Sequence, residues 1–329
     1  MRRLVGFGLV AVVAVAVVAV LYLRDTGSSP PAPGGKKDDG AIVLAAVGDT
    51  NPPKQKDPST SAGQIASSIR DANPFAVLHL GDVQYEYGKC WHLVNYFDRT
   101  GWGALMPKLI GTAGTTHDWT GYNDRDNYRR HMAGTCPGQT SGKSLSSKAW
   151  GSDVGPETSH YVDLGAWRVY SVSSGLWRYE PAAARRVTAW LDRELAKGRA
   201  AGDHAIVMWH EPYWTSVTEG HEKTTDTKPW VDLLDKYDVR IALHGHQHGY
   251  ERFDPQTADG TENSASGTQA FTVGSGGIGF YDFESRARHS SARQAHTYGW
   301  LQLTLRRYGH YDWRFVPTGG GTYSDSGSR

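Results

Sequence analysis

Several apolar runs in this 329-residue sequence end at an aspartate or a histidine. Runs of strand length stop at Gly48-Asp49, Gly81-Asp82, Trp209-His210 and Gly245-His246-Gln247-His248. Strands that are apolar on both faces and alternate with helix-like segments predict a layered α/β core. In such sheets, ligands bind where loops leave the carboxyl ends of strands. We therefore expect these polar side chains to converge on one crevice.

The residue types at these positions favour metal binding. Each position taken alone is weak evidence for a metal ligand, because Gly-Asp after a strand is often a turn and a lone histidine is often a core residue. Together they offer two carboxylates, three imidazoles and the phenol of Tyr85, which is about the number of ligands that two metal ions require. Only 2 cysteines stand against 14 histidines, which excludes a cysteine-rich zinc module.

The expected elements follow the apolar periodicity. Helices are expected near residues 61–71, 182–198 and 228–237, and Pro181 suits the first turn of the second of these. Strands are expected at residues 41–47, 75–80, 108–113, 205–210 and 239–245, in a hairpin at 161–172, and as antiparallel pairs near 268–273 and 299–316.

The N-terminal segment predicts export. Residues 4–23 contain no charge and would span about 30 Å as a helix, one bilayer core, behind two cytoplasmic arginines. A cleaved signal peptide is the alternative, although its apolar region is normally shorter and ends in a small-x-small site. We expect an anchor at 1–24, a Pro/Gly/Ser linker at 25–40, an extracytoplasmic catalytic domain at 41–317 and a flexible Gly/Ser tail at 318–329.

The charge balance and the two cysteines limit the binding partners and the cysteine chemistry to be expected. The 35 Lys and Arg residues nearly balance the 34 Asp and Glu residues, which argues against nucleic-acid binding driven by bulk charge. In an oxidising compartment, Cys90 and Cys136 are expected to form one disulfide rather than remain two free thiols. The sequence does not indicate an oligomeric state.

The polar positions also carry a family resemblance. The ordered series is Gly48-Asp49, Gly81-Asp82-x-x-Tyr85, His117-Asp118, Val207-x-x-His210 and Gly245-His246-x-His248. It resembles the calcineurin-like metallophosphoesterase superfamily, and the tyrosine after Gly-Asp-x-x resembles the purple-acid-phosphatase-like branch. The flanking stretches LGDVQYEYG and HQHGYERFDP are similar to those of bacterial exported members.

The resemblance implies a fold and a metal centre. The implied fold is a four-layer α/β/β/α sandwich, with two mixed β-sheets packed face to face and helices outside. One ion would be held by Asp49, Asp82, Tyr85 and His248. Asp82 would bridge to a second ion held by His210 and His246. The phenolate favours Fe(III) in one position, with Fe, Zn or Mn as the divalent partner.

The implied reaction is hydrolysis of a phosphate ester by metal-bound hydroxide, with Asp82 as a catalytic residue between the two ions and His117 near the leaving group as hydrogen-bond donor or general acid. We expect a membrane-tethered phosphatase that acts on small phosphomonoesters. The alternatives are a phosphodiesterase or nucleotidase on the same site, and a non-catalytic surface binding protein whose second metal site is degraded.

One position departs from the family pattern. The family usually reads Gly-Asn-His, with the asparagine completing the second metal site, whereas here Thr116 stands in the asparagine position. A hydroxyl is a poorer neutral donor than an amide oxygen. The second site is therefore expected to bind its ion more weakly, to recruit a water, or to use another ligand.

Other residues admit a structural and a functional interpretation. Asn51 is an outer donor or a turn former, and Arg252 is a phosphate contact or half of an ion pair. His244 is expected to be a core residue rather than a ligand. The aromatic and histidine side chains near the His210 loop line a substrate pocket or pack the loop: Trp209, Tyr213, Trp214 and His221.

Overall fold

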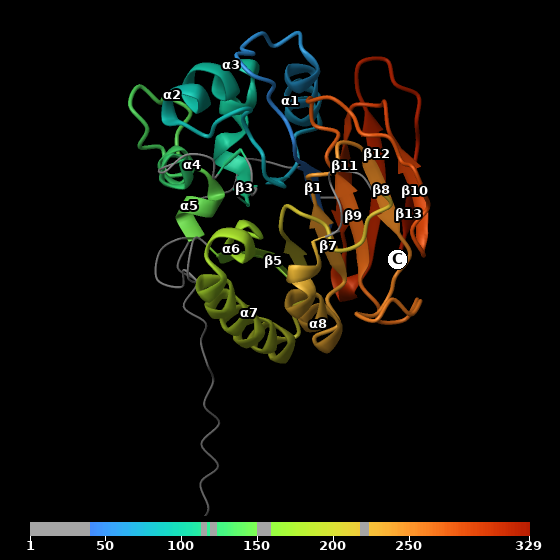
Figure 1. The fold of residues 1–329 in the computed structure, drawn as a ribbon. Coiled ribbons are helices and arrows are strands. Elements are labelled where there is room, and N and C mark those ends of the chain that lie inside the picture. The colour runs from blue at the N-terminus through green and yellow to red at the C-terminus, as the bar shows by residue number, and fades with distance from the viewer. Residues whose placement is uncertain (1–39, 113–116, 119–123, 150–158, 218–223) are drawn as a thin grey trace, which may run out of the picture. The chain divides into compact units, whose positions relative to one another are not determined.

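The computed structural model describes residues 40–112, 117–118, 124–149, 159–217 and 224–329. Two mixed β-sheets form the centre of this part of the chain (Figure 1). The first sheet has the strand order β13-β12-β11-β1-β2-β3, and the second has the order β10-β8-β9-β7-β6-β5-β4.

Most strands match the expected runs, but three had no expected counterpart (β8, β10 and β13), and β9 lies inside its sheet, parallel to β7 and antiparallel to β8, rather than in an antiparallel edge pair. The first sheet comprises β1 (Ile42–Val47), β2 (Ala76–His79), β3 (Leu109–Gly111), β11 (Gly299–Leu305), β12 (Tyr311–Pro317) and β13 (Ser326–Ser328). The second comprises β4 (His160–Leu164), β5 (Trp167–Ser171), β6 (His204–Met208), β7 (Ile241–His244), β8 (Tyr250–Phe253), β9 (Gln269–Val273) and β10 (Ser290–Gln294). β1, β2 and β3 run parallel, as do β5, β6, β7 and β9.

Helices cover the two sheets. They are α1 (Ser61–Ala72), α2 (Cys90–His92), α3 (Asp98–Thr100), α4 (Asp124–Met132), α5 (Leu145–Ala149), α6 (Gly175–Tyr179), α7 (Pro181–Ala201) and α8 (Lys228–Lys236), with a π-helical turn at Leu93–Phe97 and a 3₁₀ segment at Trp102–Lys108. In Figure 1, α7 and α8 lie beside the sheet that contains β5 and β7, and α1 to α5 lie toward β1 and β3.

The alternation of side chains along β6 explains the layers. Ile206 and Met208 belong to the apolar cluster shared by both sheets, whereas Val207 packs into a second cluster with α7 and α8. Successive strand residues point to opposite faces, so the second sheet lies between the first sheet and these helices. The predicted four-layer α/β/β/α sandwich is confirmed.

The helix predicted at 182–198 extends over Pro181–Ala201. Pro181 occupies its first turn, where a missing N–H costs nothing, and Gly202 ends it at φ 83°. Val187, Trp190 and Leu191 are buried on the predicted stripe. This stripe is core.

The predicted disulfide is present. Cys90 and Cys136 are bonded, with their Cα atoms 5.4 Å apart and a separation of 46 positions in sequence. The bond closes the stretch of chain that carries His117.

The prediction of a flexible tail at 318–329 is wrong. Residues 326–328 form β13, which pairs antiparallel with β12. Just before this strand, the Asp325 carboxylate accepts hydrogen bonds from Tyr250 Oη (2.7 Å), Arg252 Nε (2.8 Å) and Trp313 Nε1 (3.3 Å). These contacts, together with the packing of Tyr323 against the apolar core, extend the domain to Arg329.

We expect the contribution of Asp325 to stability to depend on pH. Burial alone would raise the pKa of Asp325, but its hydrogen bonds from Arg252 and Tyr250 outweigh burial and hold the pKa below the ordinary value of 3.8. The stabilisation is therefore present above that value and is lost as the pH falls through it toward the folded-state pKa.

Asp325→Asn should accordingly unfold at lower urea than the unaltered protein at pH 7, and the difference in free energy of unfolding should shrink below about pH 4. Asp71→Asn, at a carboxylate whose side chain is 70% exposed, is the control and should show little difference at either pH. A difference for Asp325→Asn that is independent of pH would contradict the ion-pair account.

Within the described residues, no helix has the length and apolar character needed to cross a bilayer. The anchor predicted at residues 4–23 lies outside these residues, as does the linker expected at 25–40 apart from Gly40.

Candidate metal centre

The predicted ligands leave the carboxyl ends of strands from both sheets. Asp49 and Asp82 follow β1 and β2 of the first sheet, and His210 and His246 follow β6 and β7 of the second. Hydrogen bonds join these ends: Gly48 N donates to Val273 O (2.8 Å), His210 Nδ1 to Leu80 O (2.7 Å) and His246 N to Asp49 Oδ2 (2.8 Å). The crevice predicted from the sequence therefore lies between two sheets, not at the edge of one.

Three of these residues have left-handed backbone conformations. The φ angles of Asp49, Asp82 and His246 are 59°, 50° and 68°. Asp and His tolerate this region better than most residues, but it still costs on the order of 1 kcal/mol each. Three such residues at three strand ends indicate that the fold holds these side chains in one arrangement at some cost in stability.

Four predicted ligands of the first ion form one buried group. Tyr85 Oη lies 3.0 Å from Asp49 Oδ1, 3.2 Å from Asp82 Oδ2 and 3.2 Å from His248 Nε2. His248 Nε2 is also 3.5 Å from Asp49 Oδ1. The structure thus brings together a phenol, two carboxylates and an imidazole, and the phenol of Tyr85 and the imidazole of His248 are separated by 163 positions in sequence.

The predicted ligands of the second ion lie beside them. His210 Nε2 is 3.3 Å from Asp82 Oδ2, and the His210 and His246 rings have centroids 5.2 Å apart. Because the carbonyl of Leu80 accepts from His210 Nδ1, Nε2 is the nitrogen that faces the site. Asp82 lies between the two groups, as a bridging ligand must.

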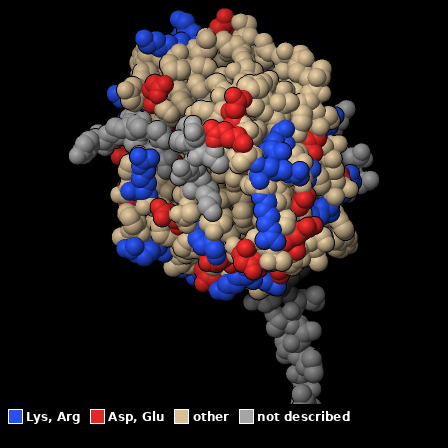
Figure 2. All heavy atoms as spheres, turned by 45° about the vertical axis from the view of Figure 1, so that its right-hand side comes forward, with Lys and Arg blue, Asp and Glu red and all other residues tan. Residues whose placement is uncertain are grey.

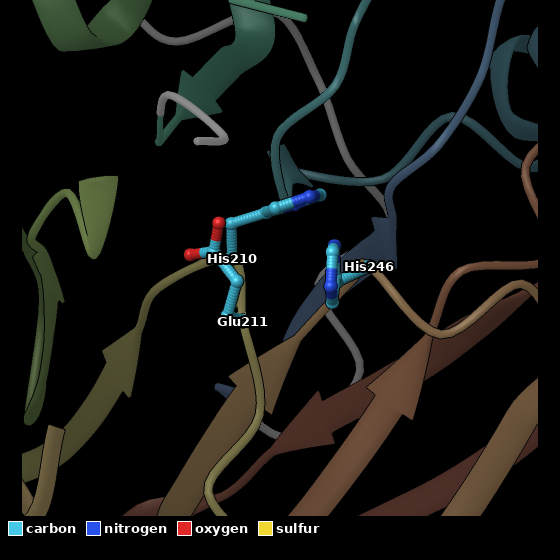
Figure 3. Close-up of side chains that lie close together, drawn as sticks. All are labelled: His210, Glu211 and His246. Atoms are coloured by element: carbon cyan, nitrogen blue, oxygen red, sulfur yellow. The ribbon is translucent and has the colours of Figure 1, made fainter. Parts of the chain in front are cut away.

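A carboxylate that sequence reasoning missed joins this second group. Glu211 follows His210 directly, is buried, and offers an oxygen within 4.8 Å of ligand atoms of both His210 and His246. Figure 3 shows His210 and Glu211 together on the loop after β6, with the His246 ring across from them. The only signal for Glu211 in the sequence was its position next to His210.

The electrostatics of the site follow from burial and from the close charges. Burial, the largest single effect, would raise the pKa of Asp49 and Asp82, but the neighbouring histidines, His210 foremost, together outweigh it and lower the pKa of both carboxyls. Burial would lower the pKa of His210, and Asp82 and Asp49 instead raise it well above its usual value. Burial, with the two carboxylates, raises the pKa of Tyr85, and burial raises that of Glu211. The two aspartates are therefore ionised, as ligands must be.

The site's own geometry fits metal ions. Among the described residues, His210 Nε2 is buried with no hydrogen-bond partner, since its 3.3 Å approach to Asp82 Oδ2 lacks hydrogen-bond geometry. Two ligand atoms at about this separation can share one ion with bonds of about 2.1 Å. A Cβ on Gly245 would lie 2.6 Å from Asp49 Oδ2 and 3.1 Å from His210 Nδ1. Only glycine therefore allows the backbone after β7 to come this close to the site.

His117 lies at the margin of this group. Its Nε2 is 3.9 Å from Asp82 Oδ2, its Nδ1 is 3.1 Å from Glu86 O, and its ring centroid is 3.9 Å from that of Tyr85. The next residue, Asp118, is buried and accepts hydrogen bonds from Asp82 N (2.8 Å) and Val83 N (3.2 Å), which positions the Asp82 loop. Thr116 lies outside the described residues.

Several of the remaining candidates have structural roles in the described chain. His244 is buried against Trp209 O at 3.2 Å, and burial lowers the pKa of His244 to about 3. Arg252 pairs with Asp325, and Asn51 Nδ2 donates to Gln55 O (2.9 Å). Trp209 is fully buried.

Tyr213 and Trp214 line a pocket of about 470 Å³ with Phe253 and Lys228, and His221 lies outside the described residues.

Comparison with known proteins gives two sequence relatives. The chain is 33% identical over 95 residues, 28% of its length, to purple acid phosphatase 15 of Arabidopsis thaliana. It is 29% identical over 156 residues, 42% of its length, to an acid phosphatase of Aspergillus ficuum. The matches span only 16% and 25% of those two proteins. No protein-family model matches the chain.

The fold also has solved relatives. A purple acid phosphatase from yellow lupin (Lupinus luteus) seeds superposes with a TM-score of 0.64 at 19% identity, covering 88% of this chain and 54% of the lupin chain. The shared fold agrees with the sequence matches. They confirm that this chain is similar to the purple-acid-phosphatase-like branch of the calcineurin-like metallophosphoesterases.

Proposed function

We propose that this chain is a metal-dependent phosphatase that hydrolyses phosphomonoesters at a dinuclear metal centre. The observation that carries the proposal is the convergence of Asp49, Asp82, Tyr85, His210 and His248 within hydrogen-bonding or ion-pair distance at the ends of four strands. Ionised carboxylates, imidazoles and a phenol fit one trivalent and one divalent ion.

The position of each side chain determines which metal ion it would hold. Asp49, Tyr85 and His248 would hold one ion, His210 and His246 the other, and Asp82 both. When bound, the ions supply Lewis acidity toward the phosphate oxygens and lower the pKa of a coordinated water. A phenolate at Tyr85 favours Fe(III) in the first position, with Fe, Zn or Mn in the second.

His117 is the proposed proton donor to the leaving oxygen. Because the Glu86 carbonyl can only accept, His117 Nδ1 carries a proton there, and the Glu86 carboxylate lies 3.4 Å from the same nitrogen. In the doubly protonated ring Nε2 also carries a proton. His117 Nε2 lies 3.9 Å from Asp82 Oδ2, so a proton on this nitrogen can be given to an ester oxygen bound there.

Selection of phosphate is assigned to the centre rather than to a basic surface. Lys and Arg side chains are interspersed with Asp and Glu on the face shown in Figure 2, and the whole chain has a formal net charge of +1. Such a surface provides no long-range attraction for polyanions. The substrate is therefore a small ester that reaches the centre, not a nucleic acid.

The proposed location is outside the cytoplasmic membrane, with residues 4–23 as the anchor, or as a cleaved signal if they are removed. The length of the apolar segment, the arginines before it and the Cys90–Cys136 disulfide support this. Extraction of the native protein from membranes only by detergent would support an anchor, and recovery in the soluble fraction would contradict it.

The activity is tested on the full-length protein purified in detergent. Metal content by mass spectrometry should approach two ions per chain, and p-nitrophenyl phosphate should turn over faster than bis(p-nitrophenyl) phosphate. Preference for the diester would replace the phosphatase with a phosphodiesterase. At most one ion, with no turnover of either ester after addition of Fe, Zn or Mn, would defeat the enzyme proposal in favour of a binding protein.

A further inference from the structure

Glu211 lies where a second-ion ligand would be needed. One ligand atom each from His210, Glu211 and His246 lie within 4.8 Å of one another (Figure 3). Around one ion with bonds of about 2.1 Å, opposite ligand atoms are about 4 Å apart. Small rotations of these side chains would therefore bring all three onto one ion.

The carboxylate is held in place by residues outside the predicted ligand set. Ser174, just before α6, donates a hydrogen bond from Oγ to Glu211 Oε2, and Glu211 N donates to the same Oγ at 3.3 Å. Trp209 Nε1 donates to Glu211 O at 2.8 Å. Metal-ligating carboxylates are commonly oriented by such hydrogen bonds. Backbone and carboxylate are thus fixed together beside His210.

The chemistry of the set matches known preferences. Two histidines and one carboxylate are a recurrent ligand set for divalent metal ions that keep a position open for water. The neutral donor expected from the family pattern is replaced in this sequence by Thr116, whose hydroxyl is a poor ligand. A carboxylate adds a negative charge that a hydroxyl or an amide does not, and so binds a divalent ion more strongly.

We propose that Glu211 is a ligand of the second metal ion, with His210, His246 and the bridging Asp82, and that it makes a donor at Thr116 unnecessary. This rests on the proposed dinuclear centre. The competing account is that Glu211 serves only as a hydrogen-bond acceptor that ties the His210 loop to Ser174.

Binding of Zn²⁺ alone separates the two accounts. The full-length protein, stripped with chelator, is titrated with Zn²⁺ by calorimetry, and bound metal is counted after dialysis. The unaltered protein should bind two ions per chain. Glu211→Ala should bind one tightly and weaken the other by about 100-fold or more, and Glu211→Gln, which retains an amide oxygen, by about 10-fold. Thr116→Ala should leave both affinities within about threefold.

Glu194→Gln is the matched control, because Glu194 is a buried carboxylate on α7 outside the metal group. It should bind two ions unchanged. Near-ultraviolet circular dichroism checks folding, and if Glu211→Ala is misfolded, the isosteric Glu211→Gln decides. Second-ion affinity unchanged in the decisive variant would overturn the ligand role alone. Fewer than two ions in the unaltered protein would overturn the dinuclear centre as well.

Discussion

Replacing Asp82 by Asn is expected to lower the turnover of a phosphomonoester on the order of 10³-fold, about 4 kcal/mol of transition-state stabilisation. Asp82 Oδ2 is 3.2 Å from Tyr85 Oη and 3.3 Å from His210 Nε2, so a single oxygen of its carboxylate borders both halves of the site. A neutral amide removes the shared negative charge from both ions at once. Metal content should fall below two ions per chain together with the rate.

Asn is chosen because the backbone of Asp82 is left-handed, at φ 50°. Asn tolerates this conformation. Ala would add backbone strain, so an effect of the lost ligand could not be separated from an effect of lost folding stability. Asp238→Asn is the matched control, since Asp238 also has φ 50° but lies in a turn beside Arg199. Its variant should keep rate and metal content. A nearly unaffected Asp82→Asn would overturn the bridging assignment.

Much of the fold could be predicted because it depends on local patterns. Apolar runs flanked by turn residues identified the parallel strands, and the stripe of Val187, Trp190 and Leu191 identified α7. β13 could not be predicted in this way. Its Ser-Gly-Ser sequence has no apolar face, and it is held by pairing with β12 and by the contacts of Asp325 with residues distant in sequence.

The candidate site was predictable in its residues but not in its geometry. Aspartates and histidines at strand ends share an edge when the strands are parallel, which was enough to expect Asp49 near Asp82 and His210 near His246. That these two edges face each other depends on packing between the sheets. Glu211 was missed because its orientation depends on Ser174, 37 residues earlier in the chain.

Adding one methyl group at Gly245 is expected to damage both stability and metal binding. A Cβ there would lie 2.6 Å from Asp49 Oδ2, 3.0 Å from Leu80 O and 3.1 Å from His210 Nδ1. Leu80 O is a backbone atom that also accepts from His210 Nδ1, so it cannot move without releasing the imidazole. Gly245→Ala should cost about 1–3 kcal/mol in the free energy of unfolding, as overpacking of a tight site does.

The same clash displaces Asp49 and His210, which are proposed ligands of different ions, so Gly245→Ala should also bind fewer than two Zn²⁺ per chain. Urea unfolding of the metal-free protein isolates the packing cost, and metal counting measures the site. Gly279→Ala is the control, because a Cβ at Gly279 meets nothing within 4 Å. If Gly245→Ala matched this control in both measurements, the site could take up a methyl group without moving its ligands. The backbone after β7 would then not be rigidly packed against the metal centre.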